Sequence, residues 1–129
     1  MADKVVLLLV EDDELVSQFV EDALEDAGYS VLRAKDGHVA VESLSQKSGE
    51  IAGLITDIRL GSGPNGWEVA CHAREIKSTI AVVYVSGDSA AEWAAHGVPK
   101  SVILQKPFVG AQLVTAISSL LNETDSSLN

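Results

Sequence analysis

The chain has 129 residues, of which 47% are hydrophobic, and its formal net charge is -10 at pH 7. This length fits one globular domain, and the acidic excess argues against a nonspecific nucleic-acid surface or an anionic-membrane surface. A single cysteine, Cys71, excludes an internal disulfide and fits a reducing cytoplasm. The longest early apolar run, at residues 5–10, is too short to cross a membrane. We therefore expect a cytoplasmic protein with protein or cation partners, and neither nucleic-acid nor membrane binding.

Short aliphatic runs alternate along the chain with segments of helical periodicity. The runs predict strands at 5–10, 30–34, 51–56, 80–85 and 101–104, and several are apolar throughout, as is typical of strands buried on both faces. The periodic segments predict helices at 15–27, 38–46, 66–76, 90–96 and 109–121. Repeated βα units with right-handed crossovers give a mostly parallel sheet covered by helices on both faces. Residues 123–129 lack apolar periodicity, and we expect them to form a disordered tail.

The first predicted helix has the clearest pattern. Its apolar residues fall on one stripe, and Gly28 ends it. The stripe consists of Leu15, Val16, Phe19, Val20, Ala23, Leu24 and Ala27. Asp13 precedes the stripe and is expected to be the N-cap, since an Asp side chain can accept hydrogen bonds from the first turn. In the third helix, Cys71 is expected to be a small buried residue.

Polar side chains follow four of the five predicted strands. They are Glu11, Asp12 and Asp13 after the first, Asp57 after the third, Ser86, Gly87 and Asp88 after the fourth, and Gln105, Lys106, Pro107 and Phe108 after the fifth. In open parallel α/β sheets the ligand site lies beyond the carboxyl ends of the strands, so these residues should meet at one edge. Their several carboxylates outnumber one ammonium, which favours a hard divalent cation such as Mg²⁺.

Four motifs at these strand ends carry a resemblance to a known family. They are VEDD before the first helix, LITDIRL around Asp57, VYVSG at Ser86 and LQKPF at Lys106. Together they resemble the receiver domain of bacterial response regulators. The resemblance implies a flavodoxin-like (βα)5 fold, a doubly wound parallel five-stranded sheet of order 2-1-3-4-5, with the receiver domain at residues 4–122.

The resemblance also implies a function. A histidine kinase or a histidine phosphotransfer protein would pass a phosphoryl group to Asp57, and the change would switch contacts with a downstream protein. Ser86 and Lys106 would then bind phosphoryl oxygens. Such a chain catalyses its own phosphorylation and dephosphorylation, but it is a signalling switch rather than an enzyme.

The same resemblance assigns a Mg²⁺ (or Mn²⁺) site. The implied ligands are Glu11, Asp12, Asp57 and the backbone carbonyl of Arg59, with Glu11 acting through water. We further expect a stand-alone receiver that is a monomer or a weak homodimer. The dimer contact would use the face formed by residues 90–96, 101–104 and 109–121.

The sequence departs from the family pattern at several positions near the site. Gly61 stands where Pro is common, in a loop that runs one residue longer than usual. Ile103 replaces an aromatic residue whose ring commonly reports phosphorylation, and Gly87 replaces a common Ala and could loosen its loop. Arg59 and Asp88 occupy the two variable positions that flank the phosphoryl group. Because their charges are opposite, we predict that they pair across the mouth of the site and slow attack by water.

Several of these residues also fit other interpretations. Asp12 could cap the first helix, Asp57 could be a turn residue and Lys106 a solvated charge. A receiver that keeps the fold as a scaffold without phosphorylation remains an alternative because of Ile103. The presence of the five site residues argues against it: Glu11, Asp12, Asp57, Ser86 and Lys106. An Asp-nucleophile phosphatase would need a second Asp at position 59, which is Arg. A flavin-binding module would need a hydroxyl- and Gly-rich loop where Glu11 begins an acidic run that repels phosphate.

Overall fold

The computed structural model describes residues 4–88 and 90–127 of the chain. Its strands are β1 (Val6–Val10), β2 (Ser30–Ala34), β3 (Ile51–Asp57), β4 (Ala81–Ser86) and β5 (Ser101–Gln105). Its helices are α1 (Glu14–Asp26), α2 (Gly37–Gln46), α3 (Gly66–Ile76), α4 (Trp93–His96) and α5 (Gly110–Ser127), with a 3-10 turn, η1 (Ala90–Glu92), before α4. No helix among these residues is long and apolar enough to span a membrane.

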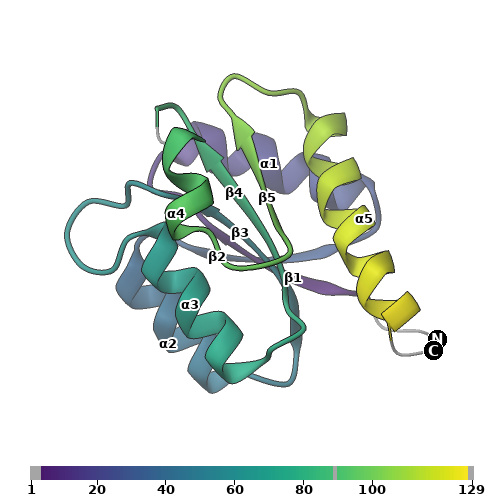
Figure 1. Cartoon of the computed structure of the whole chain (residues 1–129). Coiled ribbons are helices and arrows are strands. Elements are labelled where there is room, and N and C mark those ends of the chain that lie inside the picture. Colours follow the sequence, from purple (N-terminus) through teal and green to yellow (C-terminus); the bar gives the residue numbers. More distant parts are fainter. Residues whose placement is uncertain (1–3, 89, 128–129) are drawn as a thin grey trace.

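The strands form one parallel sheet of order β2-β1-β3-β4-β5, the order that the family resemblance implied. Figure 1 shows α1 and α5 on one face of this sheet and α2 and α3 on the other. Alternate residues of a strand point to opposite faces. Each strand therefore contributes side chains to two hydrophobic cores, one on each face of the sheet. Leu7 and Leu9 of β1 pack with α1 and α5, whereas Leu8 and Val10 pack with α2 and α3.

The N-cap residues of α1 and α3 agree with the helix starts predicted from the sequence. Asp13 is the N-cap of α1, and its Oδ1 accepts hydrogen bonds from the backbone N–H groups of Leu15 (2.9 Å) and Val16 (3.1 Å). Asn65 caps α3 through a reciprocal capping box with Glu68. These caps satisfy backbone donors that would otherwise lack partners in the first turn, and they fix where each helix leaves the sheet edge.

Three details of the helices differ from the sequence-based prediction. The buried residues of α1 are Ser17, Val20 and Leu24, so the apolar stripe is rotated and leaves Leu15 83% exposed. Cys71 is exposed because the buried side of α3 is formed by other residues. The last helix continues to Ser127 instead of ending at 121, since residues 122–127 contain neither Gly nor Pro to stop it. Residues 128 and 129 of the expected tail lie outside the described residues, and the domain bounds 4–122 stay a prediction.

The loop between β3 and α3 has a shape that its glycines make possible. Gly61 has a φ of 78°, which Pro cannot adopt because its ring holds φ near -65°. Gly63, with a φ of 88°, lies so close to the imidazole of His38 that a Cβ there would clash with the ring. The loop therefore packs on the first turn of α2, and the missing Pro is explained by a backbone that needs Gly.

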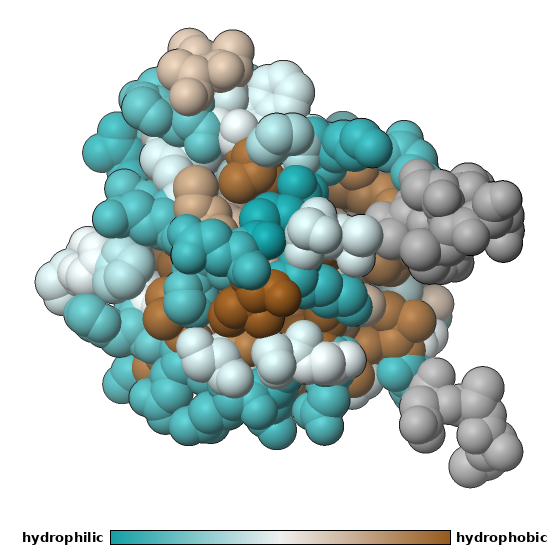
Figure 2. All heavy atoms as spheres, turned by 60° about the horizontal axis from the view of Figure 1, so that its bottom comes forward, coloured by the Kyte–Doolittle hydropathy of each residue, from teal (hydrophilic) through white to brown (hydrophobic). Residues whose placement is uncertain are grey.

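Figure 2 turns the bottom of Figure 1 forward. On this face the apolar side chains are bordered by polar ones. The most exposed large apolar side chains of the described residues are Leu15 and Val109, at 83% and 61%. Leu15 follows β1 in the chain and Val109 follows β5. Both residues therefore lie toward the carboxyl ends of the strands, where the candidate site is found.

Candidate functional site

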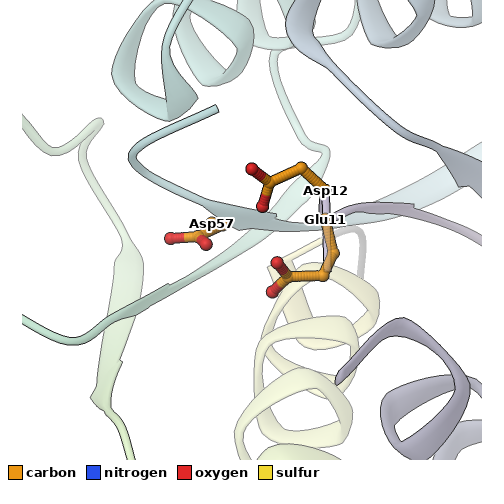
Figure 3. Close-up of side chains that lie close together, drawn as sticks. All are labelled: Glu11, Asp12 and Asp57. Atoms are coloured by element: carbon orange, nitrogen blue, oxygen red, sulfur yellow. The ribbon is translucent and has the colours of Figure 1, made fainter. Parts of the chain in front are cut away.

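Three carboxylates gather at the carboxyl ends of β1 and β3. Glu11 and Asp12 follow β1, and Asp57 is the last residue of β3, which lies next to β1 in the sheet. Each side chain offers one oxygen that lies within 4.8 Å of those of the other two. Figure 3 shows the three carboxylates beside one another at this edge. The parallel register of β1 and β3 therefore brings together acids that are far apart in the sequence, as predicted.

Burial and hydrogen bonds fix two of these carboxylates. Glu11 is 5% exposed and Asp57 is 9% exposed, whereas Asp12 is exposed. Glu11 Oε2 accepts a hydrogen bond from the backbone N–H of Asp13 (3.1 Å). Asp57 Oδ1 accepts one from the backbone N–H of Ile58 (2.7 Å). Residue-type patterns could not reveal these two donors, because any non-proline residue supplies a backbone N–H.

The ammonium of Lys106 connects the two buried acids. Its Nζ donates to Asp57 Oδ2 (3.1 Å) and to Glu11 Oε1 (3.3 Å). Lys106 follows β5, at the far edge of the sheet from β2, so its side chain reaches across β4 to the acids. The site thus contains one cation against three carboxylates.

The pKa values of Glu11 and Lys106 reflect this deficit of positive charge. Burial raises the pKa of Glu11 to about 7; the nearby charge of Asp57 adds to this, and the Asp13 N–H and Lys106 oppose it. Burial alone would lower the pKa of Lys106, but its hydrogen bond and charge interactions with Asp57, and those with Glu11, outweigh burial and raise it. An additional cation would therefore be favourable among these oxygens.

These residues fit a magnesium ion. Mg²⁺ takes oxygen ligands, and it is commonly bound through one or two carboxylates together with phosphate oxygens and water. The clustered oxygens of Glu11, Asp12 and Asp57 provide such ligands, and the raised pKa of Glu11 reflects an environment that disfavours uncompensated negative charge. The side chains that could hold the ion are the three acids predicted from the sequence.

Ser86 completes the edge on the β4 side. It ends β4, is 2% exposed, and its backbone carbonyl accepts a hydrogen bond from the N–H of Lys106 (2.7 Å). Its Oγ accepts a hydrogen bond from the N–H of Asp88 (3.2 Å). Ser86 is thereby tied both to the β5 end that carries Lys106 and to the loop that leads to α4.

Arg59 and Asp88 form the predicted pair. Arg59 Nε donates to Asp88 Oδ1 at 3.0 Å, which joins the loop after β3 to the loop after β4. The two side chains are 72% and 61% exposed, so solvent screens the pair. The pairing is confirmed by the geometry, and its effect on the lifetime of a phosphoryl group stays a prediction.

Gly66 lets α3 begin directly against the phosphoacceptor candidate. A Cβ at Gly66 would overlap the backbone of Asp57 and Ile58, and its N–H donates to the Ile58 carbonyl (2.8 Å). Gly87 differs, since a Cβ there would meet no atom within 4 Å and its φ is outside the left-handed region. A larger side chain than that of glycine therefore has no room at Gly66, whereas it has room at Gly87.

Replacing Gly87 with alanine is therefore expected to raise the free energy of unfolding by about 0.4–1 kcal/mol, because Ala reduces the freedom of the unfolded chain. Urea unfolding of the two proteins measures the difference. Gly66→Ala serves as the contrasting variant and should destabilise the protein. A Gly87→Ala protein that is less stable than the wild type would show that this loop needs glycine.

Comparison with known proteins agrees with the fold. Residues 7–118 match the response regulator receiver domain family. The chain therefore belongs to the response regulator receiver domains of two-component systems.

Individual relatives span most of the chain. A response regulator receiver protein from Sinorhizobium medicae has 47% identity and a TM-score of 0.90, with 95% of this chain and 98% of that one covered. The receiver protein CpdR of Brucella abortus is 32% identical over 89% of this chain and 95% of its own length. The sensor kinase CckA of Brucella abortus is 29% identical over 97% of this chain, which spans 13% of that kinase. The similarity thus extends to a receiver protein of about this length and to a receiver segment within a longer kinase.

Proposed function

We propose that this chain accepts a phosphoryl group on Asp57 in a Mg²⁺-dependent reaction and thereby switches its contacts with a protein target. The observation that carries the proposal is the placement of Lys106 between Glu11 and Asp57 beside a third carboxylate. A scaffold with no phosphoryl chemistry has no need for three acids and one ammonium at a half-buried edge, because the mutual repulsion of the acids works against folding.

The transfer itself requires little from the protein beyond position and charge. An oxygen of Asp57 attacks phosphorus, an O–P bond forms, and the N–P bond to the donor imidazole breaks as the imidazole leaves. The Ile58 N–H and the Lys106 ammonium hold the two Asp57 oxygens before the reaction. After it, Lys106 and the Ser86 hydroxyl bind phosphoryl oxygens. A bound Mg²⁺ supplies charge stabilisation between the carboxylates and the phosphoryl group.

The proposed metal ligands are Glu11 through water, Asp12 and Asp57 directly, and the backbone carbonyl of Arg59. The side-chain part of this set is supported by the clustered carboxylate oxygens. Mn²⁺ offers the same preference for oxygen ligands and is the expected substitute. Metal binding is measurable on the free chain by titration calorimetry, in which Asp12→Ala should weaken it.

The phosphoryl donor is proposed to be a histidine kinase or a histidine phosphotransfer protein. Exposed apolar side chains beside the site support a protein partner, because such side chains mark contact surfaces when they cluster. Leu15, Phe19 and Val109 are 83%, 48% and 61% exposed, and the Phe19 ring contacts Phe108 two residues after Lys106. This surface joins α1 to the β5–α5 loop at the mouth of the site.

We further propose that this receiver acts in the cytoplasm. It is a monomer or a weak homodimer that associates through α4, β5 and α5. The acidic charge of the chain, with the exposed carboxylates of α1, favours protein partners over nucleic acid.

Phosphoramidate tests the proposal, since it carries the N–P bond that a phosphohistidine also carries. After incubation with Mg²⁺, intact-mass analysis should show one added phosphoryl group that is stable in acid and labile in base. A sample with excess chelator should show none. Absence of any gain in the presence of Mg²⁺ would leave the scaffold interpretation.

Arg59→Ala is expected to shorten the life of the phosphorylated state. The Arg59–Asp88 pair closes one side of the mouth, and an exposed pair of this kind is worth about 0.2–1 kcal/mol, so dephosphorylation should speed up by up to about fivefold. Decay of the phosphorylated mass after removal of the donor measures the rate. Arg33→Ala, which breaks a surface pair with Glu14 and Glu21 on α1, is the control. An unchanged decay rate in Arg59→Ala would remove this role from the pair.

A further inference from the structure

The two tryptophans of the chain differ in how their indole N–H groups are used. Trp93 is 36% exposed, and its Nε1 donates a hydrogen bond to Ser101 Oγ (3.0 Å). Trp67 is only 8% exposed, yet its Nε1 has no hydrogen-bond partner within residues 4–88 and 90–127. A buried tryptophan usually pairs this N–H group. The more buried of the two indoles is therefore the one whose donor is unused.

This N–H group reaches the surface at a cleft. No buried side-chain nitrogen or oxygen of the described residues lacks a hydrogen-bond partner, so Trp67 Nε1 is accessible from outside. Trp67 lines a cleft of about 660 Å³ between the loop after β3 and the segment of η1 and α4, and Figure 1 shows α4 above α3 on the same side of the sheet. The Trp67 ring packs on that of Tyr84, with the centroids 4.7 Å apart. The cleft therefore offers a donor whose direction is fixed by packing.

The cleft combines buried apolar lining residues with polar ones, as binding sites for organic ligands usually do. Ile58 and Leu60 line it and are 4% and 3% exposed, so they offer an apolar base of small area. Asn65 also lines it, and its side-chain oxygen accepts the N–H of Glu68 (2.9 Å) in the capping box of α3. The NH2 group of Asn65 has no partner in the described part of the chain, so the cleft contains a second unused donor.

The charges of the cleft favour an uncharged ligand that both accepts and donates hydrogen bonds. Arg59 lines the cleft, but its charge is shared with Asp88 at 3.0 Å. Glu68 and Glu92 line it as well, so a ligand carboxylate would be repelled. Glu92 is exposed and does not cap α4, so its carboxylate is available to accept a hydrogen bond. A cation is disfavoured in turn by the two unused donors.

A peptide group meets these requirements. Its carbonyl oxygen can accept from Trp67 Nε1 or from the Asn65 NH2 group, and its N–H can donate to Glu92. Peptide recognition commonly works in this way, with main-chain hydrogen bonds giving affinity and a pocket for a side chain giving specificity. A neutral peptide also avoids the cost of burying a charge beside Glu68 and Glu92.

We propose that this cleft binds an extended, uncharged segment of a protein partner. A carbonyl of the segment accepts from Trp67 Nε1, an N–H donates to Glu92, and one apolar side chain lies over Ile58 and Leu60. The inference goes beyond the function proposed above and does not rest on it, because neither Lys106 nor any of the three clustered carboxylates takes part.

Fluorine NMR of protein labelled with 5-fluorotryptophan tests the proposal. The probe is N-acetyl-leucine methylamide, a small compound with an apolar side chain between two peptide groups, and Trp93→Phe assigns the two signals. The Trp67 signal should shift and reach a plateau as the probe is added. The Trp93 signal should stay in place, because its N–H is already paired with Ser101.

Analogues of the probe test the class of ligand. The glycine analogue lacks the apolar side chain, and the aspartate and lysine analogues carry a charge. Each should bind about fivefold more weakly or worse than the leucine compound. Binding of the aspartate or lysine analogue as tightly as the leucine compound would overturn the assignment of an uncharged segment.

Two substitutions remove polar contacts and leave the packing intact. Asn65→Asp keeps an oxygen that caps α3 but removes the NH2 group, and Glu92→Ala removes an exposed acceptor. Each should raise the dissociation constant of the leucine compound about fivefold, the usual effect of one lost hydrogen bond. Glu75→Ala removes an exposed carboxylate of α3 outside the cleft, so it is the matched control and should bind as the wild type does.

A Trp67 signal that never reaches a plateau, or a dissociation constant that is unchanged in either variant, would overturn the proposal. Mg²⁺ and a phosphodonor are left out of every sample. Failure of this experiment therefore counts against the cleft alone, whereas failure of the phosphoramidate experiment counts against phosphoryl transfer.

Discussion

Replacing Asp57 with asparagine is expected to abolish phosphoryl acceptance and leave the fold intact. The amide keeps the size of the side chain, and its oxygen can still accept the Ile58 N–H, but it is not a nucleophile toward phosphorus. Relief of the repulsion between Asp57 and Glu11 compensates for the weakened contact with Lys106. The thermal unfolding midpoint should therefore change little, whereas the added phosphoryl mass should disappear.

Asp22→Asn is the control for this change. Asp22 is an exposed α1 residue whose carboxylate accepts from Gln18, so the variant alters the same functional group far from the site. It should gain one phosphoryl group at the wild-type rate. Full phosphorylation of the Asp57→Asn protein would show that another residue is the acceptor and would contradict the assignment.

Lys106→Met is expected to slow phosphoryl transfer roughly 100-fold or more, the usual cost of removing one preorganised group that stabilises transition-state charge. The methionine stem preserves most of the packing of the Lys106 side chain but removes the ammonium that contacts Asp57 and Glu11. The rate of mass gain at saturating Mg²⁺ measures the effect.

The same variant should bind Mg²⁺ at least as tightly as the wild type, because Lys106 and the metal compete for the same carboxylate charge. Calorimetric titration separates this effect from the rate. Lys35→Met is the matched control, since it removes an exposed lysine just after β2 at the same edge of the sheet. A Lys106→Met protein that is phosphorylated at the wild-type rate would exclude an electrostatic role for the ammonium.

The sequence predicted the architecture because the signals that set it are local. Short apolar runs and helical periodicity placed every strand and helix to within three residues, except that α5 ends six residues later than predicted. The observed strand order is the one that the family resemblance implied. The meeting of Glu11, Asp57 and Lys106 followed from one general rule, that ligand sites lie at the carboxyl ends of parallel strands. The motifs at these ends supplied the roles of the side chains.

What the sequence did not predict depends on tertiary packing. The stripe of α1 has seven apolar residues, and only packing decides that Leu15 stays exposed while Ser17 is buried. Cys71 is exposed because α3 turns other residues inward. The contacts of Trp67 with Tyr84 and His96 join three elements through rings whose spacing in the sequence carries no periodic signal.

The Arg59–Asp88 pair could be predicted from the sequence only in part. Opposite charge at two flanking positions predicted a pair, and the structure places the guanidinium and the carboxylate 3.0 Å apart. The pair could be predicted because both residues follow strands that are neighbours in the sheet, so that a sequence separation of 29 becomes a short distance. Its strength could not be predicted, since exposure decides how much solvent screens it.

Localisation of the phosphoryl group tests the central claim most directly. The phosphorylated chain is digested under acidic conditions, in which an acyl phosphate survives, and the peptides are sequenced by tandem mass spectrometry. We predict that the added mass lies on the peptide containing Asp57, at that residue, and only in samples that contained Mg²⁺. A phosphoryl group on any other residue, or one gained equally well in excess chelator, would contradict the account.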